Sequence, residues 1–76
     1  MVEYKTIKSE EIKFGGNNFI EVSRKKAVTP ESEREFISIS RGFILLDGQK
    51  RYKQSLTVPD LREVVEFVSE KLKEML

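Results

Sequence analysis

The feature that most limits the possible folds is a change in the spacing of apolar residues along the chain. Through Phe36–Ser40 apolar and polar side chains alternate, which is typical of a β-strand with one buried face. From Leu61 to Leu76 apolar residues recur every three or four positions, as on one side of an α-helix. A chain of 76 residues has room for one domain only. We therefore expect one α+β domain with strands first and a single C-terminal helix.

The first two predicted strands are marked by turn residues and a glycine. Phe19–Ser23 follows a Gly-Gly-Asn-Asn cluster at residues 15–18, a strong signal for the start of a strand. The second strand begins at Phe36 and continues to Leu46. Arg41–Gly42 interrupts its alternation, and a glycine inside a strand often marks a β-bulge.

The remaining chain adds a third strand and one ambiguous segment. Asp47–Gly48 predicts a two-residue hairpin turn, which leads into a third strand at Tyr52–Val58. Residues 1–11 form either an edge strand, since Val2, Tyr4 and Thr6 alternate, or a loose N-terminal extension. The sheet therefore has three strands, or about four if this segment joins it.

The predicted helix has an unusually wide apolar side. Pro59 and the Asp60-x-x-Glu63 pattern predict a capped first turn. Half of the circumference is apolar, which suits either a core helix on the sheet or a helix that also meets a second subunit. Small chains without disulfides often oligomerise, so a homodimer is expected. The candidate dimer interface consists of Val64, Phe67, Val68, Lys71, Leu72 and Met75.

The absence of two residue types limits the chemistry of the chain. It has no Cys and no His, so we expect no disulfide, no metal site and no Ser-His-Asp or Cys-His catalysis. The carboxylates Glu21, Glu31, Glu33, Glu35 and Asp47 show no paired spacing. We therefore expect no enzyme activity and no cofactor. Residues 1–11 lack an apolar signal-peptide core, and the longest apolar run has four residues, so an intracellular protein of the cytoplasm, nucleoid or nucleus is expected, with no membrane partner.

The charges are distributed unevenly along a chain whose net charge is only +1. Residues 12–58 hold nine basic and five acidic residues, a net charge of +4. Residues 1–11 carry −1 and residues 59–76 carry −2. The predicted sheet is therefore basic and the predicted helix acidic, although such clusters are in many proteins only solvated surface.

Aromatic residues lie among these basic residues. Ile20, Val22, Ile37 and Ile39 mark one face of the sheet, so Phe19 and Phe36 point away from that face. Phe43 reaches the second face only if Gly42 introduces a bulge. Basic side chains that neutralise phosphates, beside rings that stack on bases, are typical of single-strand binding. The candidate binding residues are Arg24, Lys25, Lys26, Arg41, Lys50, Arg51 and Lys53, with Phe19, Phe36, Phe43 and Tyr52 as stacking rings.

The order of these segments is similar to that of a known family. IKFGGNNFIEVSRKK (residues 12–26), EFISISRGFILLDGQ (35–49) and KRYKQSLTVPDLREV (50–64) resemble the single-stranded-DNA-binding domain of positive cofactor four, a Whirly-like family of transcriptional coactivators. The resemblance covers residues 12–76, which it implies are a single nucleic-acid-binding domain. It implies a curved antiparallel sheet, a C-terminal helix that pairs two subunits, and single strands bound along the sheets.

The resemblance also assigns roles to individual residues. Phe43 matches an aromatic residue that stacks on a base, Lys53 and Gln54 match a basic pair before the last strand segment, and Arg24–Lys26 match a basic strand end. The chain departs from the family pattern at Ser40, where an Arg is usual, and at Gln54–Ser55, where Lys-Gly is usual.

These observations lead to one preferred function and two alternatives. We expect sequence-independent binding of single-stranded DNA by a small homodimer acting in transcription, replication or repair. The alternatives are a coactivator-type adaptor that binds transcription or replication proteins, and a single-stranded RNA binder.

Overall fold

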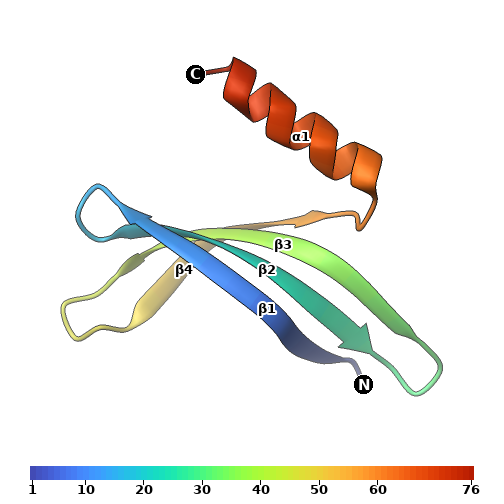
Figure 1. The fold of residues 1–76 in the computed structure, drawn as a ribbon. Helices are drawn as coiled ribbons and strands as arrows, with labels where there is room; N and C mark the ends of the chain where they lie inside the picture. The colour runs from blue at the N-terminus through green and yellow to red at the C-terminus, as the bar shows by residue number, and fades with distance from the viewer.

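Four strands form one antiparallel sheet in the same order as they occur in the chain (Figure 1). The computed structural model describes all 76 residues. The strands are β1 (Glu3–Phe14), β2 (Asn18–Val28), β3 (Glu33–Ile44) and β4 (Lys50–Val58), and the chain ends in α1 (Arg62–Glu74). The predicted α+β order of strands followed by one C-terminal helix is confirmed.

Residues 1–11 do not form a loose extension. Residues 3–11 belong to the edge strand β1, which pairs with β2 from Glu3 to Phe14. The register shifts once, between Thr6 and Lys8, so Ile7 occupies a bulge. A bulged edge strand rich in charge resists pairing with other chains.

Two of the three hairpin connections contain glycines with a positive φ. Gly15 and Gly16 between β1 and β2 have backbone φ angles of 55° and 87°, a conformation that residues with a Cβ atom rarely adopt. The predicted two-residue turn at Asp47–Gly48 is wrong, because β3 ends at Ile44 and the connection spans residues 45–49. Leu45 closes this loop by donating its backbone N–H to the Gln49 carbonyl, at 2.8 Å.

The start of the helix also differs from the prediction. Leu61, not Asp60, is the N-cap residue, and no side chain caps the first turn. The carboxylate of Asp60 is instead held by Arg24 of β2. A long-range ion pair has therefore replaced the local capping interaction that the Asp60-x-x-Glu63 pattern predicted.

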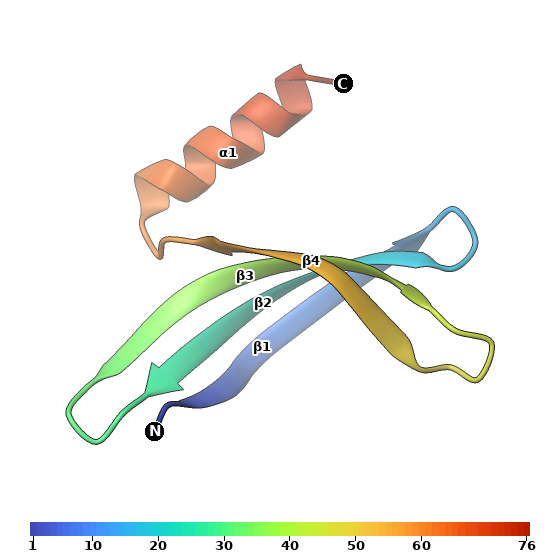
Figure 2. The ribbon, with the colours of Figure 1, turned by 180° about the vertical axis from the view of Figure 1, so that it is seen from behind.

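The helix stands away from the sheet, and it is joined to β4 only through residues 59–61 (Figures 1 and 2). No helix residue is buried, and Phe67 and Leu72 remain 61% and 63% exposed. The interpretation of α1 as a well-buried core helix is therefore wrong for the single chain. The buried apolar side chains are Phe19 and Val58, so this chain encloses very little core of its own.

The sheet bows gently, with its convex side toward the helix, and it does not curl strongly (Figures 1 and 2). The family resemblance implied a curved antiparallel sheet, and the sheet is antiparallel and only gently bowed. The single helix is neither long enough nor apolar enough to cross a membrane.

Candidate nucleic-acid interface

Strand register divides the side chains between two faces of the sheet. Val22 of β2 pairs with Ile39 of β3, and Ile39 pairs with Leu56 of β4, so these three side chains share a face. Arg24 lies on the same face and binds Asp60 at the start of the helix, so we call it the helix-side face. The other side of the sheet is the opposite face.

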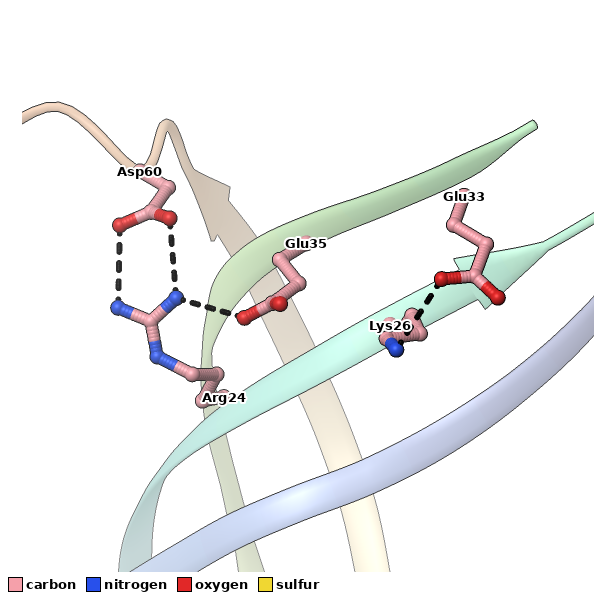
Figure 3. Close-up of polar contacts among 5 residues, drawn as sticks. All are labelled: Arg24, Lys26, Glu33, Glu35 and Asp60. Atoms are coloured by element: carbon pink, nitrogen blue, oxygen red, sulfur yellow. Dashed lines mark hydrogen bonds and ion pairs between the residues drawn. The ribbon is translucent and has the colours of Figure 1, made fainter.

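Two of the predicted phosphate-binding residues on the helix-side face are already ion-paired (Figure 3). The Nη1 and Nη2 atoms of Arg24 donate to the Asp60 carboxylate at 2.9 and 3.0 Å, and Nη1 also donates to Glu35 at 3.1 Å. These contacts hold the pKa of Asp60 below its usual value. Lys26 Nζ lies 3.2 Å from Glu33 Oε2. The basic end of β2 is therefore largely neutralised.

The far end of the helix-side face carries basic residues without acidic partners. Arg41, Arg51 and Lys53 are exposed and form no ion pair. Arg51 is the direct cross-strand neighbour of Phe43, and Lys53 Nζ lies 5.9 Å from the centre of the Phe43 ring. Three unneutralised cations therefore surround one half-buried aromatic ring.

A hollow of about 460 Å³ opens among these residues. Phe43 is the only apolar residue in its lining, which consists of Asn18, Arg41, Gly42, Phe43, Lys53 and Gln54. Four of these, Arg41, Phe43, Lys53 and Gln54, were candidate binding residues in the sequence. Asn18 was missed, because it reads only as a turn residue until the register places it opposite Phe43.

A second hollow of about 540 Å³ continues from the first along the sheet. The two share Arg41 and Gln54, which pair directly across β3 and β4. The second hollow is more apolar, since Ile20, Ile39 and Leu56 also line it. The two adjacent hollows lie along the helix-side face, and we call them together the two-hollow path.

The bulge near Gly42 has a different effect from the one expected. The extra residue lies in β4, where Lys53 has no partner because Arg41 pairs with Gln54 and Gly42 with Tyr52. The pairing of β2 with β3 continues without a break through Phe43. Phe43 therefore keeps the parity of Ile37 and Ile39. The two hollows lie on the helix-side face and not on the second face, to which Phe19 and Phe36 point.

Three residues predicted to bind with Phe43 lie on the opposite face. Phe19 is 0% exposed, so its expected role as an open stacking ring is contradicted. Tyr52 packs edge-on against Phe19 with ring centres 5.3 Å apart, and its hydroxyl donates to Glu21 Oε1 at 3.0 Å. Partial burial, and then this hydrogen bond, raise the pKa of Tyr52. Lys50 is ion-paired with Glu11 and Glu21.

The last two predicted residues also lie on the opposite face, near its other end. Lys25 pairs across the sheet with Phe36 and forms no ion pair. The Phe36 ring packs edge-on against Tyr4, at 6.2 Å between ring centres. This pair is separated from the two-hollow path by the thickness of the sheet.

The candidate dimer residues all lie on α1. Val64, Val68 and Lys71 are partly covered, whereas Phe67, Leu72 and Met75 are exposed. Lys71 Nζ lies 5.8 Å from the centre of the Phe67 ring and 3.2 Å from Glu74 Oε1. The apolar side of the helix is thus available to another molecule.

Comparison with known proteins gives no assignment. No family model, curated protein or solved structure matches this chain.

Proposed function

We propose that this chain binds single-stranded nucleic acid, with DNA preferred, along the helix-side face of its sheet. The observation that carries the proposal is the cluster of Arg41, Arg51 and Lys53 around Phe43, with no acidic partner for any of the three cations. Such cations attract phosphates, and an aromatic ring stacks on any base.

The shape of the path supports a strand rather than a duplex. The hollows lie in the surface of a slightly bowed sheet and not on an α-helix or a two-stranded ribbon, the elements that enter the major groove of DNA. Stacking on Phe43 requires an unpaired base, which a duplex does not supply. The resemblance of residues 12–76 to positive cofactor four agrees with this proposal.

The active form is proposed to be a homodimer that pairs through α1. The helix has an exposed apolar side, and the chain encloses only two buried apolar residues. A domain with so little core gains stability when a second copy covers apolar surface.

A second candidate is a protein-binding adaptor, which the same uncovered helix favours. A side-by-side titration distinguishes the candidates, using fluorescently labelled 20-mers of single-stranded DNA, double-stranded DNA and RNA. We expect single-stranded DNA to bind most tightly. Absent binding of all three would leave the adaptor as the better function, and equal binding of all three would contradict the preference for single-stranded DNA.

A further inference from the structure

The first hollow contains groups that phosphate binding does not need. Arg41 and Lys53 provide the positive charge, whereas Asn18 and Gln54 add neutral amides. The side chain of Gln54 forms no hydrogen bond in the structure, and the oxygen of the Asn18 amide is also free. An amide presents a donor beside an acceptor, which is the pattern that base edges carry.

The positions of Arg41 and Gln54 make a combined recognition unit. The two residues are direct cross-strand partners on one face, so their Cβ atoms lie about 5 Å apart. A planar guanidinium and an amide therefore extend side by side into the same hollow. The Phe43 ring forms the apolar wall of this hollow.

One base matches this combination best. An Arg fork pairs with two adjacent acceptors, and guanine offers O6 and N7 on one edge. Guanine also carries N–H donors next to O6, which the amide oxygen of Gln54 can accept. Adenine places an N–H₂ group where guanine has O6, and that group faces the donors of Arg41 unfavourably. A volume of about 460 Å³ also accommodates a purine.

We propose that the first hollow is a guanine-selective subsite in which Arg41 and Gln54 read the base edge while Phe43 stacks on its ring. This inference rests on the proposed function and adds a preference at one nucleotide per chain. Strands without guanine still bind through their phosphates, because Arg51 and Lys53 act on any sequence.

The test compares three labelled 18-mers, (TTG)6, (TTA)6 and (TTC)6, by fluorescence anisotropy at one salt concentration. We expect (TTG)6 to bind about tenfold more tightly than (TTA)6, within the range of one specific base contact. The Arg41→Lys variant keeps the positive charge but loses the two parallel N–H donors of the guanidinium group. It should bring the affinity for (TTG)6 to within about twofold of that for (TTA)6, because the loss for (TTG)6 exceeds the loss for (TTA)6. Gln54→Leu should reduce the preference in the same way.

The possible outcomes separate this inference from the proposed function. Equal, salt-dependent binding of all three strands would overturn the guanine subsite and leave single-strand binding intact. No binding of any strand would overturn both. Tightest binding of (TTC)6, or a guanine preference that survives both variants, would overturn the assignment to this base or to these residues.

Discussion

Lys50 Nζ lies 2.8 Å from Glu11 Oε2, although the two residues belong to the two opposite edge strands of the sheet. The side chains of Lys50 and Glu11 therefore meet across the opposite face at this end of the sheet. The Lys50 side chain passes over Phe19, with Nζ 5.2 Å from the ring centre, which helps to explain why this ring is fully buried. The ion pair closes this end of the opposite face, whereas the unpaired cations Arg41, Arg51 and Lys53 lie on the helix-side face.

Replacing the stacking ring should weaken DNA binding. We expect Phe43→Ala to lower the affinity for a single-stranded 20-mer by about 5- to 150-fold, since one stacked base contributes roughly 1–3 kcal/mol. Tyr52→Ala is the matched control, because Tyr52 lies on the opposite face and should change affinity by less than about twofold. Anisotropy titrations measure both variants, and equal losses would refute the assignment of the site to one face.

Adding a single methyl group at Gly42 should destabilise the fold. A Cβ there would lie 1.9 Å from the backbone oxygen of Arg51 and 3.0 Å from the Tyr52 Cα, and backbone atoms cannot rotate away. We expect Gly42→Ala to lower the free energy of unfolding by about 1–3 kcal/mol or more. Urea unfolding measures this loss, with the exposed neighbour Ser55→Ala as control. Equal unfolding midpoints for the two variants would contradict the close strand approach.

Acid should weaken the fold through two carboxylates. Lys50 lowers the pKa of Glu11 and Arg24 lowers the pKa of Asp60, in both cases mainly by hydrogen bonding. A carboxylate with a lowered pKa in the folded state stabilises it above the ordinary value and loses this effect as the pH falls. The ordinary values are 4.5 and 3.8, so stability should decrease as the pH falls below about 4.5.

The cation partners do not alter this expectation. The pKa values of Lys50 and Arg24 are raised, so their contributions persist at neutral pH and are lost only in strong alkali. Urea midpoints at pH 7, 5, 4 and 3 measure the effect. The urea midpoint of the double variant Glu11→Gln, Asp60→Asn should change less with pH than that of the unmodified chain. An identical pH dependence would exclude these two ion pairs as the cause of the acid sensitivity.

The helix should control oligomeric state. An Asp at position 68 would place an unpaired charge within the proposed dimer interface, so Val68→Asp should weaken dimerisation by more than about a hundredfold. Glu66→Ala, outside the candidate interface, is the control and should stay dimeric. Light scattering gives the mass of each species. A dimer that survives Val68→Asp, or an unmodified chain that is monomeric, would count against pairing through α1.

The sequence was sufficient to predict the order of strands and helix, because local patterns determine these elements. Alternation at Phe36–Ser40, the Gly-Gly-Asn-Asn turn and the apolar spacing after Leu61 predicted strands and helix in the right order. The placement of the helix was not predictable, because amphipathic spacing does not distinguish a helix that packs on its own sheet from one that meets another molecule. The sequence could not show that Arg24 takes Asp60 from the helix cap, since these residues are 36 positions apart.

The candidate site was only partly predictable, because the sequence shows the residue types but not the contacts between distant strands. Arg41, Phe43, Lys53 and Gln54 were among the twelve candidate binding residues, but which of the cations are free of acidic partners depends on the register of distant strands. Arg24, Lys26 and Lys50 are paired with acids from other segments, and composition alone does not reveal such pairs. The bulge was expected in β3 at Gly42, but the extra residue lies in β4 at Lys53.

The dependence of binding on salt tests the central claim most directly. Each phosphate neutralised on a single strand contributes about −0.7 to the slope of log affinity against log salt. For a labelled single-stranded 20-mer, Lys53→Gln should make this slope shallower by about 0.7, whereas Lys26→Gln, which removes a cation already paired with Glu33, should leave it unchanged. An affinity insensitive to salt, or equal changes of slope in the two variants, would contradict a phosphate-binding cluster at Arg41, Arg51 and Lys53.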